Sequence, residues 1–304
     1  MGGVGMRYIL SAASMFAALF APVAQAGAQE AKVFRPASAW ALDYGDDYCR
    51  LMRDFSDGKD TVGLFVERTQ PGPMMRLIVV GNSIRLFRGS EQVGFRFAPS
   101  GSERMVQRLR FETNGEQYLN LGPTTFAERP APAPGTPPAM PGPYQPQDEV
   151  AAAAQVSGIA LQHGLASPIL IETGPLGEAA GALQACADDL LASWGLDAEK
   201  HRSLARPVIP AGPTAGWIAR DVVSFQDFAR LSGGNNELRV MVDKAGKPTS
   251  CHVQWPSLAQ TANEKICAGV MEKGEFTPAL DQSGQAMDSY WTTSVFFLMP
   301  PMGR

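Results

Sequence analysis

The stretch Glu237–Leu298 constrains the fold most, because the spacing of its apolar residues changes from strand-like to helical and back. Every second residue is apolar in 237–243 and again in 249–255, and a glycine-containing turn separates the two runs. This spacing is typical of half-buried antiparallel strands. Apolar residues at helical spacing follow from Thr261, and the β-branched and aromatic run 290–298 comes last. The stretch therefore predicts a three-stranded sheet covered by one helix.

The chain has four cysteines, Cys49, Cys186, Cys251 and Cys267, which allow three pairings. Cys251 lies on the apolar face of its predicted strand and Cys267 on the apolar stripe of the predicted helix, so both point to the seam between sheet and helix. We therefore expect the disulfides Cys251–Cys267 and, by elimination, Cys49–Cys186. Four reduced thiols, or a redox-active pair, are the alternative, although no Cys-x-x-Cys sequence is present.

The order of motifs over residues 217–304 resembles that of the TonB C-terminal domain family. The matching order is a helix at Val222–Leu231, two strands about a glycine turn, a helix, the segment Phe276-Thr277-Pro278-Ala279, a turn at Asp281–Gly284 and a final strand. The resemblance implies a small α+β domain of the Gram-negative envelope. Family members are energy transducers that pass inner-membrane energy to outer-membrane transporters. Their last strand is the edge that pairs with a short peptide of the transporter.

The predicted last strand has apolar residues on both faces, whereas a half-buried strand needs them on only one. One interpretation is that the helix or the rest of the chain covers the second face. The other is an edge that accepts a strand from a partner protein. The residues that we expect at this partner-binding edge are Tyr290, Thr292, Ser294, Phe296 and Leu298. The resemblance implies an envelope protein as partner, with a TonB-dependent outer-membrane receptor as the candidate.

The first 26 residues have the pattern of a cleavable secretory signal. Arg7 precedes the apolar run Tyr8–Val23, and Ala24-Gln25-Ala26 ends it. The run has roughly 16 residues, fewer than the roughly 20 that span a bilayer. We expect removal of 1–26, a mature chain that does not span the membrane, and a periplasmic location. The alternative is an uncleaved anchor, and with it a membrane-anchored energy-transducing protein for TonB-dependent transport, although this segment lacks the family's histidine and a periplasm-crossing spacer.

Residues 27–205 predict a separate β-rich domain, joined by a linker at 206–216 to the domain 217–304. Short strands separated by turn residues indicate an antiparallel sandwich or open barrel. The expected strands are Thr61–Arg68, Met75–Val80, Ile84–Arg88, Val93–Phe97, Met105–Glu112, Gln117–Leu121 and the shorter 169–174. A helix at Leu176–Trp194 carries Cys186 on its apolar side, and the Pro-rich stretch Arg129–Gln147 is expected to be a loop. The fold class is therefore α+β.

Composition and motifs argue against nucleic-acid binding, metal binding and catalysis. The net charge is −4 and no basic run is present, so we expect no nucleic-acid partner. His163, His201 and His252 are isolated in sequence, and His252 is expected to face solvent. The carboxylates about Asp47 do not follow the spacing of a calcium-binding loop, which favours solvated turn residues. We expect no catalytic residue, metal or cofactor; an enzyme in the β-rich domain is a further alternative that no residue singles out.

Overall fold

The computed structural model describes residues 30–113, 115–128, 146–219, 235–255 and 260–296, together with Gly2 and Val222. By their contacts the residues divide into two units, Met1–Glu30 and Ala31–Arg304. The predicted signal 1–26 therefore falls almost entirely outside the described residues, as do most of the predicted helix Val222–Leu231 and the position of Leu298. Among the helices that are described, none combines the length and the apolar character needed to cross a membrane.

The unit Ala31–Arg304 contains an eleven-stranded sheet in which all but one pair of neighbours is antiparallel. The exception is the parallel pair β1–β11. Its strands are β1 (Lys32–Pro36), β2 (Ala41–Tyr44), β3 (Cys49–Ser56), β4 (Thr61–Arg68), β5 (Met75–Val80), β6 (Gln92–Ala98), β7 (Arg104–Gln107), β8 (Leu109–Thr113), β9 (Glu116–Thr124), β10 (Gly158–Leu161) and β11 (Ile169–Ile171). Their order is β7-β6-β10-β11-β1-β3-β4-β5-β9-β8, with β2 also paired to β3. The end strands β7 and β8 are separated in sequence by Arg108 alone, so the two ends of the sheet meet, as in an open barrel.

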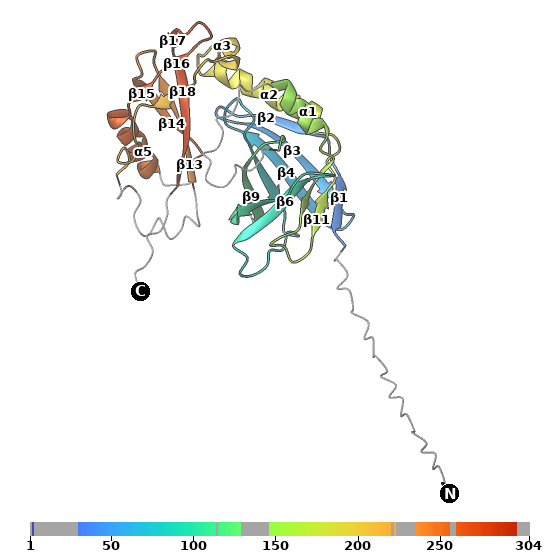
Figure 1. Cartoon of the computed structure of the whole chain (residues 1–304). Helices are drawn as coiled ribbons and strands as arrows, with labels where there is room; N and C mark the ends of the chain where they lie inside the picture. Colours follow the sequence, from blue (N-terminus) through green and yellow to red (C-terminus); the bar gives the residue numbers. More distant parts are fainter. Residues whose placement is uncertain are drawn as a thin grey trace, which may run out of the picture. The chain divides into compact units, whose positions relative to one another are not determined.

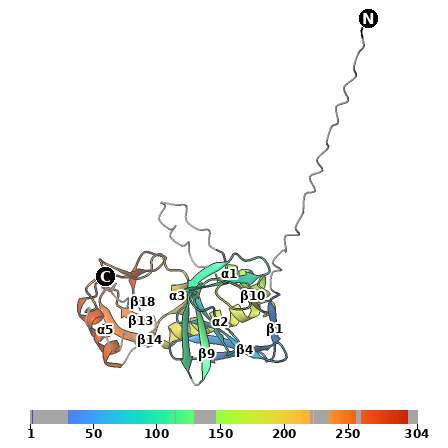
Figure 2. The ribbon, with the colours of Figure 1, turned by 90° about the horizontal axis from the view of Figure 1, so that it is seen from below.

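Two helices, α1 (Pro146–Ala154) and α2 (Gly177–Ser193), accompany this sheet. They pack on each other, and α2 packs on β2 and β3 (Figures 1 and 2). Apolar residues of α2 such as Leu183 enter the same core as Phe34, Phe55 and Leu77 of the strands. The disulfide Cys49–Cys186 joins β3 to α2 inside this core, where both cysteines are fully buried.

A second, smaller core lies in the C-terminal part of the same unit. The elements there are α3 (Ala198–Arg202), β12 (Ile209–Pro210), β13 (Asn235–Val242), β14 (Pro248–Trp255), α5 (Gln260–Lys273), β15 (Phe276–Thr277), β16 (Ala279–Leu280), β17 (Ala286–Met287) and β18 (Ser289–Phe296). The main sheet of this part has the order β14-β13-β18. Leu238 and Val240 of β13 pack against Ile266 and Val270 of α5. The disulfide Cys251–Cys267 joins β14 to that helix.

The structure confirms a mixed α+β fold with a large, mostly antiparallel sheet and few helices. Both disulfide pairs are those expected from the sequence. Because the unit Ala31–Arg304 includes both expected domains, the boundary at 206–216 stays a prediction.

Two strand predictions were wrong. Ile84–Arg88 is not a strand, and Leu86 forms only an isolated bridge, to Leu165. Ile84 is buried although it belongs to no strand, so its apolar side chain gave a misleading signal. Met105–Glu112 is divided at Arg108 into β7 and β8, which pair with β6 and β9 respectively. The backbone N–H of Arg108 donates to the carbonyl of Glu91, so it leaves the β8–β9 ladder.

Candidate functional site

The strand β18 lies at the edge of the three-stranded sheet and pairs along its whole length with β13. Within the ranges that the structure describes, no other strand pairs with its second edge. Trp291 and Val295 anchor one face of β18 in the small core. The Trp291 ring lies 5.3 Å from that of Phe276, centroid to centroid. The strand is thus fixed in place by aromatic packing while one row of backbone groups stays unpaired by any described strand.

The other face of β18 lies against residues that precede the three-stranded sheet in the chain. The Tyr290 ring is edge-on to Trp194 at 5.2 Å between centroids, and the His201 ring stacks on it at 6.1 Å. Burial raises the pKa of the Tyr290 hydroxyl. The hydroxyl of Thr292 donates to Oε1 of Gln70 at 2.5 Å. These contacts explain why both faces of the strand carry apolar residues: part of the second face is covered within the chain.

The five residues expected at the partner-binding edge are therefore placed differently. Tyr290 and Thr292 are partly buried by the contacts just described, while the side chain of Ser294 is exposed. The backbone of Phe296 pairs with Asn235, and Leu298 lies outside the described residues.

Two cavities border β18, and Thr292 lines both. One has a volume of about 590 Å³ and lies beside Ser289–Thr292. Apolar residues of its wall include Leu191, Leu204 and Val208. The other has a volume of about 260 Å³ and is lined by 292–294 at one side.

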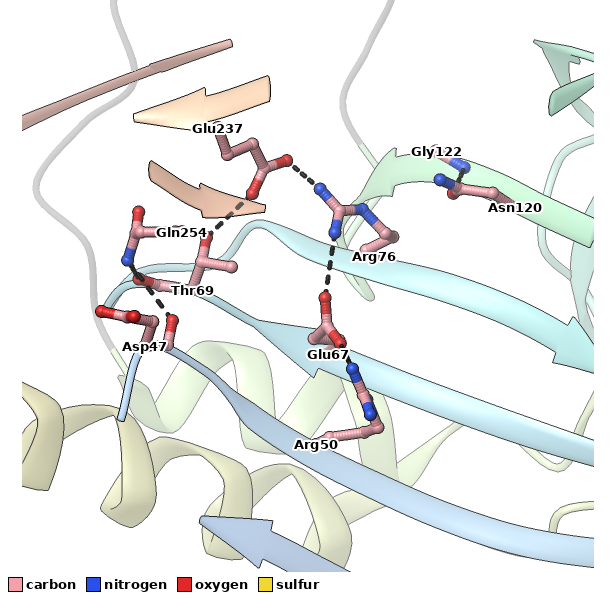
Figure 3. Close-up of polar contacts among 9 residues, drawn as sticks. All are labelled: Asp47, Arg50, Glu67, Thr69, Arg76, Asn120, Gly122, Glu237 and Gln254. Atoms are coloured by element: carbon pink, nitrogen blue, oxygen red, sulfur yellow. Dashed lines mark hydrogen bonds and ion pairs between the residues drawn. The ribbon is translucent and has the colours of Figure 1, made fainter. Parts of the chain in front are cut away.

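A chain of buried ion pairs links the small sheet to the large one beside this edge (Figure 3). Glu67 of β4 accepts from Arg50 of β3 at 2.8 and 2.6 Å, and from Arg76 of β5 at 2.9 Å. Arg76 also pairs with Glu237 of β13. The side chain of Glu67 is fully buried, and Arg76 is 8% exposed. Charged groups this deep are stable only when paired and hydrogen-bonded, which fixes the two sheets against each other.

A bulge in the neighbouring strand β9 lies next to Arg76. Between the pairs Arg76–Pro123 and Ile78–Asn120, β9 has one residue more than β5. Oδ1 of Asn120 accepts from the backbone N–H of Gly122 at 2.8 Å, and Gly122 has a φ of +71° (Figure 3). A bulge of this kind redirects the side chains opposite it. Here it lies opposite the residues next to Arg76, at the start of β5.

A second group of contacts joins β13 and β14 to Asp47, which lies between β2 and β3, and to Thr69, which follows β4. Oδ1 of Asp47 accepts a hydrogen bond from Nη1 of Arg239 at 2.9 Å, and Oδ2 of Asp47 lies 2.5 Å from Nε2 of His252. The amide nitrogen of Gln254 donates to the backbone carbonyl of Thr69 at 2.8 Å, as Figure 3 shows. His252 is exposed, as expected, and Asp47 lies in a bend with a half-buried side chain. What the sequence did not indicate is that Asp47 and His252 are in contact with each other. Each finds its partner more than two hundred residues away in sequence, where local alternation carries no information.

Sequence reasoning missed the chain of ion pairs, although the register contains a signal for it. Arg50, Glu67 and Arg76 are direct cross-strand neighbours in β3, β4 and β5. Opposite charges at matched positions of adjacent strands attract each other. The last member, Glu237, comes from a separate sheet and has no such signal. Within the described ranges, no cluster of three or more His, Cys, Asp or Glu residues has a geometry suited to a metal ion.

Fold and site together define a disulfide-containing α+β protein in which β18, at the edge of the small sheet as far as the described strands go, lines two cavities. Comparison of the chain with protein-family models, with curated proteins and with solved structures finds no match.

Proposed function

We propose that this chain is a non-enzymatic protein of the periplasm whose C-terminal sheet binds an envelope protein by strand addition at β18. The observation that carries the proposal is the position of β18: it is an eight-residue edge strand that pairs only with β13 among the described strands. An unpaired edge is a template for another chain.

The geometry supports both affinity and selectivity. Backbone hydrogen bonds along Ser289–Phe296 supply affinity that is independent of the partner's sequence. Successive side chains of an added strand point to opposite sides of the sheet. The two cavities beside Thr292 then receive side chains from the partner and favour some sequences over others.

The disulfides and the motif order support the location and the class of partner. Two disulfides are compatible with a secreted or periplasmic protein, because such bonds persist in oxidising compartments. The resemblance of 217–304 to the TonB C-terminal domain implies an envelope protein as partner, with a TonB-dependent outer-membrane receptor as the first candidate.

Site-specific photo-crosslinking in cells tests the proposal, with the two outer strands of one sheet compared. A photoreactive residue replaces Ser294 of β18 in one strain and Ser250 of β14 in another; both side chains are exposed. The proposal expects one discrete adduct from position 294 and none of the same mass from position 250. Equal patterns from both positions, or no adduct from 294, contradict it.

A blocking substitution makes the same comparison without a crosslinker. A lysine on an edge strand discourages pairing with another strand. Ser294→Lys should abolish co-purification of the partner that crosslinking at position 294 identifies, whereas Ser250→Lys should leave this co-purification unchanged. Loss with both variants indicates a general effect on the sheet rather than binding at β18.

A further inference from the structure

The larger of the two cavities beside β18, of about 590 Å³, lies along the edge of that strand. Four consecutive residues, from Ser289 to Thr292, line it. Successive residues of a strand point to opposite faces of its sheet, so a cavity that touches four in a row lies beside the strand rather than over one face. Among the described residues that line the cavity, none belongs to the paired neighbour β13. The cavity therefore lies at the edge of β18 with which no described strand pairs.

The wall of this cavity is mainly apolar. Its aliphatic and aromatic residues come from α2, from the segment between α3 and β12, and from β18 itself. They include Leu191, Leu204, Val208 and Trp291. Sites that bind small groups commonly have a volume of this size and a wall of this character. An apolar side chain that enters the cavity is stabilised because water leaves its surface.

The ionisable groups of the wall leave no charge for a ligand to pair with. Asp188 pairs with Arg202 at 2.5 Å. Nδ1 of His201 lies 2.7 Å from the carbonyl oxygen of Asp197, and Nε2 lies 3.0 Å from Oγ of Ser289. Burial lowers the pKa of this imidazole, so it is uncharged at neutral pH. A charged group would lose its hydration without gaining a counter-charge, so the wall favours an uncharged one.

Tyr290 gives the wall a polar atom that has no partner among the described residues. Burial alone raises the pKa of its hydroxyl, with no contribution from a hydrogen bond. The inaccessible side-chain atoms that lack a partner do not include this oxygen, so it retains accessible surface. Trp194 and His201 contact the ring of Tyr290. The hydroxyl is thus surrounded by protein and still reachable, as expected for a polar atom at a cavity, and an entering group can form a hydrogen bond with it.

We infer that this cavity receives an aromatic side chain of the strand that is added to β18, and that tyrosine is preferred there. A tyrosine ring is apolar and uncharged, and its hydroxyl both donates and accepts, so it can pair with the hydroxyl of Tyr290. The strand that carries it lies beside β18, about 4.8 Å away. The inference rests on the proposed strand addition and specifies the kind of residue that the partner presents.

Titration of the full chain with three capped residues, followed through the methyl NMR signals of Leu204 and Val208, tests the cavity by itself. The probes are the N-acetyl methylamides of tyrosine, phenylalanine and glutamate. We expect saturable shifts with the tyrosine probe. Phenylalanine, which lacks the hydroxyl, should bind about fivefold more weakly, and the charged glutamate at least about tenfold more weakly. No shifts with the tyrosine probe, or equal affinity for tyrosine and either of the other two, overturn the inference.

Removal of one hydroxyl tests the part assigned to Tyr290. Tyr290→Phe should lower the affinity for the tyrosine probe to that for phenylalanine and leave the affinity for phenylalanine unchanged. Tyr44, which is exposed and does not line this cavity, supplies the matched control Tyr44→Phe, which should change neither affinity. A preference for tyrosine that persists in Tyr290→Phe, or that both variants remove, overturns the inference.

A cavity-filling variant locates the binding. The side chain of Ala205 is exposed and lines the cavity, so Ala205→Trp adds bulk without removing a side-chain hydrogen bond. Ala268 of α5 is also exposed and does not line the cavity, so Ala268→Trp is the matched control. Weakening by Ala205→Trp alone supports the inference. Unchanged binding in both variants, or equal weakening in both, overturns it.

An extended pentapeptide, acetyl-Thr-Val-Tyr-Val-Thr-amide, tests whether the side chain arrives on a strand. It should bind at least about tenfold more tightly than the capped tyrosine, because its backbone adds hydrogen bonds along β18. Ser294→Lys should remove this gain. Binding no tighter than that of the capped tyrosine overturns the inference. The crosslink from Ser294 separates the two proposals: a discrete adduct there, without any preference for tyrosine in the titrations, overturns the inference and leaves strand addition standing.

Discussion

Arg76 of β5 and Glu237 of β13 form an ion pair that joins the large sheet to the small one. The same guanidinium also pairs with Glu67, whose side chain is fully buried. One arginine thus neutralises two carboxylates from two sheets. The position of the small sheet, and with it the cavity beside β18, depends on this residue.

Replacing Arg76 with methionine should therefore destabilise the protein strongly. Glu67 then keeps only Arg50 as partner, and removal of one member of a buried pair costs about 3–5 kcal/mol. The measurement is the free energy of unfolding in urea. The exposed pair Arg35–Glu172 supplies the control, because Arg35→Met should cost about 1 kcal/mol or less. Similar losses in the two variants contradict the role given to Arg76.

The two disulfides should contribute unequally. Cys49–Cys186 closes a loop with a sequence separation of 137, and Cys251–Cys267 one of 16. In the chain-entropy model these loops correspond to about 5 and about 3 kcal/mol respectively. Urea unfolding of the two double-alanine variants measures both values. A larger loss for the shorter loop would show that strain or residual structure, rather than loop length, decides the contribution.

Stability should fall above pH about 10, the ordinary pKa of tyrosine, partly because of Tyr290. Burial raises the pKa of its hydroxyl in the folded protein. Above pH about 10 the unfolded chain loses this proton while the folded chain keeps it, so rising pH favours unfolding. Melting temperatures at several alkaline pH values should decline less steeply for Tyr290→Phe than for the unchanged protein. Tyr44→Phe, which alters an exposed ring, should follow the unchanged protein.

Mild acid should also destabilise the protein, through His201. Burial lowers the pKa of this imidazole in the fold, against the opposing effect of its hydrogen bond to Asp197. As pH falls below about 6.5 the unfolded chain takes up a proton that the folded chain does not, so stability decreases. His201→Gln should reduce the loss between neutral pH and pH 5 in unfolding experiments. The exposed His163 provides the comparison, since His163→Gln should leave the acid dependence intact.

Much of the fold could be predicted where periodicity and turns agree. The expected strands Thr61–Arg68 and Met75–Val80 have the bounds of β4 and β5, because turn residues limit runs that are strongly apolar. The strands β1 to β3 were not expected, since charged residues such as Arg53 and Asp54 interrupt their apolar pattern. Their ladders form through pairing with partners that local sequence does not reveal.

The site could be predicted only in part, for a similar reason. The disulfide Cys251–Cys267 follows from two faces that periodicity defines. The contacts of Glu237 with Arg76, and of Asp47 with His252, join residues far apart in sequence. Such contacts depend on how two sheets meet, which no local pattern encodes. The covering of Tyr290 by Trp194 belongs to the same class.

Amide hydrogen exchange of the chain, with and without the partner captured through Ser294, tests strand addition most directly. New backbone hydrogen bonds slow exchange at the amides that form them. The account predicts new protection along Ser289–Phe296 and unchanged exchange along the opposite edge strand, Pro248–Trp255. Protection confined to Pro248–Trp255 or to the helix Gln260–Lys273, with none in β18, would contradict it.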